Sequence, residues 1–296
     1  MMNISIVFLQ GGLGNQLFQY AFFLSKKEKG ENVVCNSTML QISVQHNGFE
    51  LKSLFDIQDV ECNSNKLFLR MLCRFIVNRE FKFKKVVLKC LSFCGLQLVI
   101  DAIPSVYQPQ FPDCKHRTYY LGYWQTEKYF VHIRQQLLDV FCFDESKLSP
   151  QTLSVRNRIQ CSNSVSLHVR RGDYLSEQNK KLYDGICTLN YYERAISMME
   201  ERVTNPVFYI FSDDMEWVRQ SLNVSNATFI DWNRREDSWQ DMYLMSQCKH
   251  NIIANSTFSW WGGWLNTNSE KIVVCPSRFI NSSMLSDIIP GSWIKL

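Results

Sequence analysis

The second half of the chain alternates short apolar runs with segments of helical periodicity, and this alternation constrains the fold more than any other feature. The apolar runs are Val165–Val169, Val207–Phe211, Ala227–Ile230, Asn251–Ala254 and Ile272–Cys275. Between them lie helix-patterned segments such as Tyr191–Arg202, Met215–Leu222 and Ser238–Gln247. Regular alternation of strands and helices is typical of a parallel sheet covered by helices. We therefore expect an α/β fold.

The first half opens with the same rhythm and then loses it. We expect strands at Ile4–Leu9, Asn32–Cys35 and Tyr119–Tyr123. A glycine-rich turn after the first strand leads into a helix at Asn15–Lys29. The stretch Cys62–Gly95 breaks the alternation and is helical in pattern. This half therefore reads as a second Rossmann-like domain with an extra helical insertion.

The length fits two domains, because 296 residues exceed the roughly 100–200 residues that one domain usually takes. Ser149-Pro150 is the best boundary, since proline ends the helical pattern of Phe130–Val140. The sequence therefore predicts two Rossmann-like domains, residues 1–149 and residues 150–296.

Composition excludes several classes of protein. Hydrophobic residues make up 46% of the chain, and Lys+Arg 32 against Asp+Glu 28 gives a net charge of 32 − 28 = +4. A disordered chain and a partner such as duplex nucleic acid are therefore not indicated. The eleven cysteines form no CxxC pair, and Cys90 and Cys94 have no further Cys or His at metal-ligand spacing. We therefore expect free thiols, with no metal held by cysteine.

The N-terminus has neither the basic region nor the cleavage site of an export signal. The longest apolar stretch, Val86–Ile100, is interrupted by Lys89, Ser92 and Gln97 and is shorter than the ~20 residues of a membrane span. A cytoplasmic location is expected.

The segment Gln10–Gln16 joins the first strand to the first helix. Glycines permit close approach of a ligand, and a helix N-terminus favours negative charge. The order of the glycines matches neither GxGxxG nor GxxxxGK[ST], so a dinucleotide site or a P-loop is not indicated. A plain strand-to-helix turn and an anion cradle are both open, with Asn15 and Gln16 available as amides for a sugar or phosphate.

The strand Val165–Val169 ends directly in Arg170 and Arg171. Ligands bind at the carboxyl ends of strands in open α/β sheets, and guanidinium groups suit phosphate oxygens. The alternative is a loop held by an ion pair between Arg171 and Asp173. The Arg-Gly-Asp tripeptide also matches an adhesion sequence, which a chain without an export signal does not use.

Two further polar segments follow strands in the second half. Ser212 or Asp213 could cap a helix that begins here with acidic residues in its first turn, or the paired carboxylates of Asp213 and Asp214 could bind Mg²⁺ or Mn²⁺. Ser256 and Thr257 begin the last helix, whose N-terminus would favour an oxyanion; a simple N-cap is the alternative. Three such segments in one domain favour a nucleotide-phosphate site.

A basic cluster spans residues 66–89, with eight Lys and Arg residues opposed by Glu80 alone and interleaved with apolar residues. A basic amphipathic helix can lie on anionic lipid, and it can equally be a core helix with a solvated face. Peripheral contact with the inner face of the cytoplasmic membrane is therefore a hypothesis for this segment.

Five motifs together resemble the α-1,2-fucosyltransferase family, glycosyltransferase family 11. They are GGLGNQLFQYAF at 11–22, YYLGYWQTEKYF at 119–130, HVRRGDY at 168–174, FSDD at 211–214 and NSTFSWWGGWL at 255–265. The resemblance spans nearly the whole chain and keeps the order of the motifs. It implies a GT-B fold, GDP-β-L-fucose as donor, inversion to an α-1,2 linkage on a terminal β-galactose, and no metal or other cofactor.

The resemblance also implies roles for single residues. Arg170 resembles the arginine that holds the donor's β-phosphate, with Arg171 beside it, and His168 resembles a residue near the guanine. Asp241 resembles the carboxylate that binds guanine N1 and N2. Phosphate-side residues would be Ser256, Thr257 and Phe258, and a facing loop of the other domain would supply Gly12, Gly14 and Asn15. Asp213 then turns from metal binding toward a structural or ribose-side role.

Inversion by a single displacement needs a base near the galactose 2-hydroxyl. Asp173 is the first candidate and Glu177 the second, with His46 a weaker one; Asp173 could instead orient an arginine. Two other functions remain open: a metal-dependent glycosyltransferase using Asp213 and Asp214, and a non-catalytic glycan- or sugar-nucleotide-binding protein. The acceptor is open among galactose-terminated glycans, including lipid-linked precursors, and the oligomeric state is also open.

Overall fold

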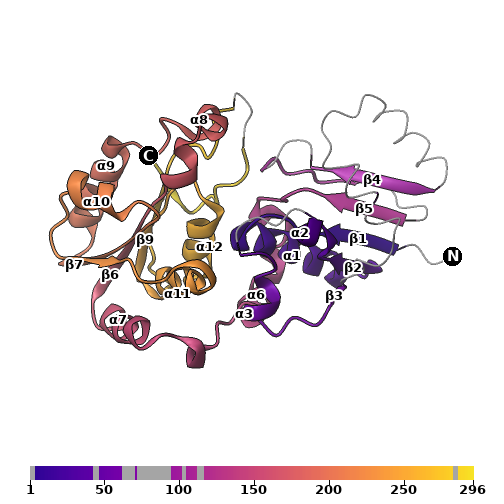
Figure 1. Ribbon diagram of the computed structural model, residues 1–296, viewed down its shortest axis with the longest axis horizontal. Coiled ribbons are helices and arrows are strands. Elements are labelled where there is room, and N and C mark those ends of the chain that lie inside the picture. Colours follow the sequence, from indigo (N-terminus) through magenta and orange to yellow (C-terminus); the bar gives the residue numbers. More distant parts are fainter. Residues whose placement is uncertain are drawn as a thin grey trace. The chain divides into compact units, whose positions relative to one another are not determined.

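The computed structural model describes residues 4–42, 47–61, 71, 95–101, 105–111, 117–282 and 286–296, apart from the side chains of Asp173 and Gln178 (Figure 1). The chain divides into two compact units, Met1–Cys142 and Phe143–Leu296, called unit 1 and unit 2 below. The boundary expected at residues 149/150 lies within unit 2, a few residues beyond this division.

Unit 1 is built on a five-stranded sheet with the order β3-β2-β1-β5-β4. All of its strand pairs are parallel. The strands are β1 (Ile4–Phe8), β2 (Val33–Asn36), β3 (Val60–Glu61), β4 (Leu96–Ile100) and β5 (Arg117–Leu121). The described helices are α1 (Leu13–Glu28), α2 (Thr38–Ile42), α3 (Leu51–Leu54) and α6 (Arg134–Val140), with 3-10 turns η1 (Glu127–Tyr129) and η2 (Val131–Ile133). The predicted first strand, helix and second strand are confirmed.

Helix α1 is buried along almost its whole length, which explains its run of Leu, Phe and Tyr. Its aromatic side chains pack on the segment after β5, where Phe22 stacks on Trp124 with ring centroids 4.4 Å apart. Gln19 joins two strand ends: its Oε1 accepts from Gln10 N at 2.8 Å and its Nε2 donates to Gly122 O at 2.9 Å. The helix therefore fixes the carboxyl ends of β1 and β5 together.

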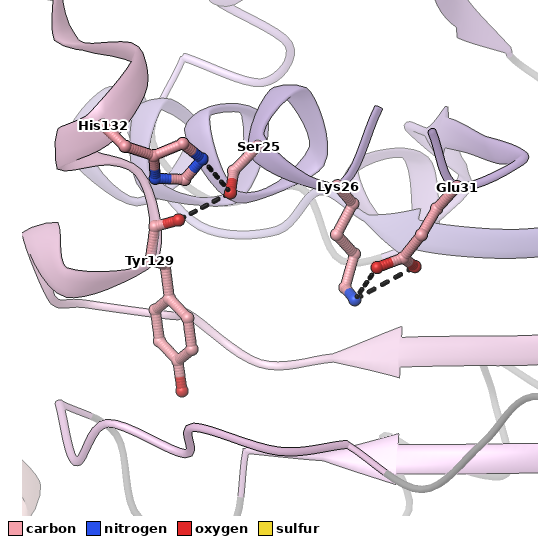
Figure 2. Close-up of polar contacts among 5 residues, drawn as sticks. All are labelled: Ser25, Lys26, Glu31, Tyr129 and His132. Carbon is pink, nitrogen blue, oxygen red and sulfur yellow. Dashed lines mark hydrogen bonds and ion pairs between the residues drawn. The ribbon is translucent and has the colours of Figure 1, made fainter. Parts of the chain in front are cut away.

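The last turns of α1 carry two buried polar residues. Ser25 Oγ donates to Tyr129 O at 2.6 Å and lies 3.4 Å from His132 Nε2, while Lys26 Nζ lies 3.0 Å from Glu31 Oε1 (Figure 2). Lys26 also faces aromatic rings, with Nζ 4.3 Å from the centroid of Tyr120. Ion pair and ring contacts together explain how an ammonium group can be buried here.

A cavity of about 420 Å³ adjoins these residues and is lined by Ser5, Asn32 and Tyr107 among others. Ser5 is near the start of β1 and Asn32 precedes β2, so the cavity lies at the amino edge of the sheet. The glycine-rich turn follows the carboxyl end of β1, at the opposite edge. The cavity therefore lies at the edge opposite the glycine-rich turn, although Phe22, Tyr120 and Tyr129 of the first two motifs contribute to its lining.

Unit 2 is built on a six-stranded sheet with the order β11-β10-β9-β6-β7-β8, all pairs being parallel. The strands are β6 (Asn163–Val169), β7 (Pro206–Ser212), β8 (Ala227–Ile230), β9 (His250–Ile252), β10 (Val273–Cys275) and β11 (Ile294–Lys295). The helices are α7 (Pro150–Gln160), α8 (Glu177–Tyr183), α9 (Leu189–Arg202), α10 (Met215–Ser221), α11 (Trp239–Gln247) and α12 (Thr257–Leu265), with 3-10 turns η3 (Glu145–Lys147), η4 (Gly172–Leu175) and η5 (Arg235–Asp237). The predicted strand-helix alternation is confirmed.

The two faces of β6 differ in chemistry. Val165, Leu167 and Val169 pack in an apolar core with residues of α9 and α10. The alternate residues are polar: Ser164 Oγ accepts from Lys249 N at 3.0 Å, and Ser166 Oγ accepts from Asn251 Nδ2 at 2.7 Å. In Figure 1, α9 and α10 lie on one side of this sheet and α11 and α12 on the other.

The chain reverses direction across the sheet at β6. Strands β7 and β8 follow on one side, and the chain then returns to place β9, β10 and β11 on the other side. In open α/β sheets the crevice for ligands forms at such a reversal, outside the carboxyl ends of the strands. The fold therefore points to the ends of β6 and β9.

Helices α11 and α12 both start at the carboxyl edge and run side by side. A Cβ built on Gly262 would lie 2.7 Å from Met245 Cβ, so glycine is what allows this close approach. Met245 follows Asp241 by about one turn in α11, and Gly262 follows Phe258 by the same interval in α12, about 6 Å along each axis. The first turns of the two helices are therefore neighbours.

The predicted helical insertion over Cys62–Gly95 and the basic segment 66–89 lie outside the described residues, except for Met71 and Gly95. Within the described ranges, no helix combines the length and apolar character needed to cross a bilayer.

We predict that Gly262→Ala lowers the thermal midpoint of unit 2. Overpacking typically costs about 1–3 kcal/mol, which outweighs the ~1 kcal/mol that alanine gains over glycine in a helix. The obstructing atom is Met245 Cβ, which cannot swing away without moving α11. Tryptophan fluorescence measures the transition, because every tryptophan except Trp124 lies in unit 2.

Gly291→Ala is the matched control, since nothing lies within 4 Å of its added Cβ. A Gly262→Ala midpoint equal to that of this control would show that the two helices separate at no cost.

Candidate functional site

The strand-end segments predicted from the sequence gather at the carboxyl edge of the unit 2 sheet. β6 ends at Val169, β7 at Ser212 and β9 at Ile252, and β6 lies between the other two strands. Residues that follow these strands therefore meet at the point where the chain reverses across the sheet.

Arg170 and Asp213 form the central pair. Val169 is in register with Ser212, so the next residue of each strand leaves the sheet beside the other. Arg170 Nη1 lies 3.2 Å from Asp213 Oδ2, and Asp213 Oδ1 accepts from Arg171 N at 2.9 Å. Gly172 is required here, because a Cβ would lie 2.7 Å from Asp213 Oδ2. Asp213 thus positions the guanidinium of Arg170.

Arg171 has different partners from those of Arg170. Its Nε donates to Asp214 Oδ2 at 3.2 Å, and its guanidinium lies 4.0 Å from the ring centroid of Trp217. Asp214 also caps α10 by accepting from Trp217 N at 3.1 Å, so the N-cap expected at Ser212 or Asp213 is one residue further along the chain. The ion pair expected between Arg171 and Asp173 stays a prediction, because the side chain of Asp173 lies outside the described residues. The described ion-pair partner of Arg171 is Asp214, which follows β7. Both aspartates of the FSDD motif thus contact arginines.

The segment after β9 provides a helix N-terminus. Ser256 Oγ caps α12 by accepting from Phe258 N at 3.3 Å, which confirms the N-cap reading. Ser256 is buried, while Thr257 and Phe258 are half-buried. The N-terminus of a helix attracts anions through its unpaired N–H groups and dipole. A phosphate group would find favourable electrostatics here.

Tyr174 connects the β6 and β9 segments, and sequence reasoning gave it no role. Its hydroxyl donates to Asn255 O at 2.9 Å, and Arg170 Cζ lies 5.7 Å from its ring centroid. Its ring stacks on Tyr183 with centroids 4.2 Å apart. The tyrosine at the end of HVRRGDY was the available signal.

His168 is the last inward-facing residue on the polar side of β6. It is 5% exposed, its ring centroid lies 6.0 Å from that of Phe258, and its Nδ1 has no hydrogen-bond partner within the described ranges. Burial, with a smaller effect of Arg170, lowers the pKa of His168 to about 3. The imidazole is therefore neutral, and its unpartnered nitrogen can bond to a ligand.

Asp241 lies in the first turn of α11, beside the first turn of α12. Its Oδ1 accepts from Asn233 Nδ2 at 2.8 Å, and no other hydrogen bond to its carboxyl group is found among the described residues. Burial raises the pKa of Asp241 to about 8, against the lowering effect of the Asn233 amide. A half-buried carboxyl group with a strongly raised pKa is typical of a functional site.

The glycine-rich loop of unit 1 and the start of α1 bond to other groups of the chain itself. Glu50 is buried, and its Oε2 accepts from Leu13 N at 3.1 Å, so a carboxylate of the chain itself lies at the N-terminus of α1. Gln16 is fully buried, and its amide bonds to backbone groups of Gly11, Gly48 and Glu50. The expected role of the Gln16 amide toward a ligand is therefore replaced by a structural one.

Gly12 and Asn15 remain half-buried, while Gly14 is buried. Asn15 Oδ1 accepts from Gln125 Nε2 at 2.9 Å, which joins the first two motifs. The predicted contacts of Gly12, Gly14 and Asn15 with a donor stay predictions.

The candidate bases are not resolved by the geometry. Asp173 belongs to η4, its side chain lies outside the described part of the chain, and so does His46. Glu177 is exposed and begins α8. The assignments of Asp173 and Glu177 therefore stay predictions.

Solved structures of fucosyltransferases share the fold of this chain. The NodZ α-1,6-fucosyltransferase co-crystallised with GDP matches with a TM-score of 0.53 at 13% identity, over 88% of this chain and 92% of that chain. A structure of NodZ from Bradyrhizobium gives 0.52 at 12% identity with the same coverage. At such low identity the likeness concerns the fold alone, and it confirms the predicted GT-B-like architecture.

The sequence then gives the family. The model described as glycosyl transferase family 11 matches residues 3–296. An α-1,2-colitosyltransferase of Escherichia coli is 35% identical over 100% of this chain and 99% of that protein. The O-antigen biosynthesis glycosyltransferase WbnK, also of Escherichia coli, is 34% identical over 97% of this chain and 99% of its own length. The chain belongs to glycosyltransferase family 11 and is a glycosyltransferase.

We predict a pH-dependent stability that depends on Asp241. The unfolded carboxyl group has a pKa of about 3.9, and the folded one is raised to about 8. Between these values the folded protein binds a proton that the unfolded chain does not, so stability falls as the pH rises through this window. Measured relative to Asp241→Asn, the free energy of unfolding of unit 2, followed by tryptophan fluorescence, should fall from pH 5 to 8. The neutral His168 makes the opposite contribution below about pH 6.5, and it does so in both proteins.

Asp241→Asn removes this titration. Its unfolding curve should resemble that of the wild type near pH 5 and lie at higher stability above pH 8. Parallel pH profiles for the two proteins would contradict the raised pKa.

Proposed function

We propose that the protein transfers L-fucose from GDP-β-L-fucose to the 2-hydroxyl of a terminal β-galactose, with inversion and without a metal. The observation that carries this proposal is the convergence of the Arg170 guanidinium and the N-terminus of α12 at the reversal point of the unit 2 sheet. Relatives named galactoside α-(1,2)-fucosyltransferase 1, such as that of Leontopithecus chrysomelas, support the reaction; this one is 31% identical over 46% of this chain and 40% of its own length.

The donor's guanine would lie against Asp241 and His168. Guanine offers two adjacent donors, N1–H and the 2-amino group, to which a carboxylate presents two acceptors. Phe258, beside His168, would pack against the nucleoside. Of the two roles expected for Asp213, structural or ribose-side, we propose the structural one, in which its carboxylate holds the guanidinium of Arg170.

The diphosphate would lie against Arg170, Ser256 and Thr257. Departure of GDP develops negative charge on the β-phosphate, and charged groups already in position stabilise that charge without reorganising. Arg170 is held by Asp213 before any ligand arrives. Because Asp213 and Asp214 already bind guanidinium groups, they are poorly placed to serve as metal ligands.

In the transfer step, the galactose 2-hydroxyl oxygen attacks the anomeric carbon while the bond from that carbon to the GDP oxygen breaks. The base takes the proton of the hydroxyl, and GDP leaves with the bonding electrons. We propose Asp173 as this base, with Glu177 as the second candidate. Gly12, Gly14 and Asn15 would approach the donor from unit 1.

A second donor deserves a parallel assay, because a relative that is 35% identical along the whole chain is named a colitosyltransferase. That relative's name keeps the α-1,2 linkage and changes the sugar. Selectivity between a fucosyl and a colitosyl donor is therefore part of the first experiment.

The acceptor is proposed as a β-galactoside-terminated glycan, with lipid-linked glycans among those to be assayed. We further propose a cytoplasmic location, with the basic segment 66–89 as a point of peripheral membrane contact. Unchanged binding to anionic liposomes after deletion of that segment would remove the membrane contact.

The deciding experiment is transfer from GDP-fucose, and in parallel from a colitosyl donor, to lactose with and without EDTA. We expect a 2-O-fucosyl galactose product in both conditions, with the linkage read by NMR. Transfer that requires added Mn²⁺ would restore the metal role of Asp213 and Asp214. Binding of GDP without transfer or hydrolysis would favour a non-catalytic protein.

We predict that Arg170→Ala abolishes transfer and that Arg170→Lys remains strongly impaired. A lysine supplies a point charge in place of the planar fork that engages both Asp213 and a phosphate. Loss of one preorganised charged donor typically costs about 10²–10³-fold in kcat. Steady-state kinetics with a thermal-unfolding control measure the effect, and turnover near the wild-type value in either variant would overturn the assignment.

A further inference from the structure

A chain of side chains leads from α7 to the carboxyl group of Asp241. Trp232 Nε1 donates to Thr152 Oγ1 at 3.1 Å, and Thr152 Oγ1 donates to Asn233 Oδ1 at 3.1 Å. Asn233 Nδ2 then donates to Asp241 Oδ1 at 2.8 Å. Thr152 is fully buried, so water does not replace these contacts.

The direction of the hydrogen bonds in this chain follows from the two donors whose protons Thr152 Oγ1 accepts. An indole N–H can only donate, so Thr152 Oγ1 must accept from Trp232. The hydroxyl of Ser149 also donates to Thr152 Oγ1, at 2.9 Å. The single proton of the Thr152 hydroxyl is left for Asn233 Oδ1. This contact decides which end of the Asn233 amide faces Asp241.

The amide orientation decides how Asp241 is held. With its oxygen bound to Thr152, Asn233 turns its NH₂ group to Asp241 Oδ1. A rotated amide would place an oxygen against the ionised carboxylate, which is repulsive. The correct amide fixes the carboxyl plane and leaves Oδ2 without a partner among the residues that the structure describes.

A second contact holds the helix that carries Asp241. Ser149 N donates to Gln240 Oε1 at 2.9 Å, and Gln240 is the neighbour of Asp241 in α11. The start of α7 therefore contacts both the residue next to Asp241 and, through Thr152, the amide that bonds to Asp241. The start of α7 thus supports both the carboxyl group of Asp241 and the helix that carries it.

We propose that Thr152 and Asn233 are positioning residues that set the selectivity of this site for guanine, by orienting the carboxylate of Asp241. The inference rests on the proposed function, in which Asp241 binds N1–H and the 2-amino group. A carboxylate that bonds to both groups must lie in the plane of the base, and a rotated one bonds to a single group. The relay keeps that plane.

The test compares the affinities for GDP and for inosine diphosphate, which lacks the 2-amino group. Titration calorimetry at about pH 8.5, above the pKa of Asp241 in the wild type, keeps most of its carboxylate ionised there. Because the Asn233 amide lowers this pKa, Asn233→Ala is titrated at two pH values, which separates protonation of the carboxyl group from loss of its orientation. We expect the wild type to bind GDP about 10–100-fold more tightly, because inosine diphosphate lacks one hydrogen bond to a charged carboxylate. In Thr152→Val this ratio should fall about three- to tenfold, mainly through weaker binding of GDP.

Three further variants separate positioning from a general loss of structure. Thr152→Ser keeps the hydroxyl and should restore the wild-type ratio. Thr228→Val makes the same chemical change in β8 and should leave the ratio unchanged. Asn233→Ala should lower the ratio as Thr152→Val does, and adding Thr152→Val to Asn233→Ala should cause no further change. Should Thr152→Val fail to fold, the half-buried Asn233 allows the same comparison.

The outcomes are distinct. A ratio unchanged in both Thr152→Val and Asn233→Ala, or equal losses for both nucleotides, overturns the positioning role and leaves the proposed function standing. A wild-type protein that does not bind GDP, or binds ADP equally well, overturns the proposed function and the inference with it.

Discussion

The register between β6 and β7 is the constraint on which the rest of the site depends. Because Val169 lies opposite Ser212, Arg170 and Asp213 leave the sheet side by side and pair before any ligand is present. A guanidinium that is already ordered loses less conformational freedom when it binds an anion. A slip of one residue would turn every side chain of β6 to the other face, moving His168 into the apolar core. The pairing of β6 with β7 thus also determines which side chains are available to a ligand in this unit.

Long periodic elements of the fold were accessible to sequence reasoning, because apolar spacing alone determines β6, β7, α9 and α11. The edge strands β3 and β4 were not. β3 has two residues, too few to show a period, and β4 belongs to an apolar stretch that also fits a helix. In the site, the motifs located the strand ends correctly, since Arg170, Asp213 and Ser256 all follow strands.

What the motifs could not supply were the partners of each polar side chain. Thr152 and Asn233 are 81 residues apart, and Leu13 and Glu50 are 37 apart, so no local pattern connects them. Polar residues near a glycine turn look alike whether they face a ligand or the backbone. Gln16 bonds to the backbone, and Arg171 bonds to the next aspartate after the one that holds Arg170. Only tertiary contacts decide between these uses.

The attachment of α7 has a consequence for how members of this family can be recombined. Ser149 and Thr152 bond to Gln240 and Asn233, so the first helix after the predicted boundary belongs to the framework of unit 2. Tyr243 also donates to Glu145 at 2.6 Å, which extends this framework toward the division at Cys142 and Phe143. A chimera that exchanges unit 1 should therefore join its parents before Phe143. A crossover at residue 150 would separate Ser149 from the partners with which it has been selected.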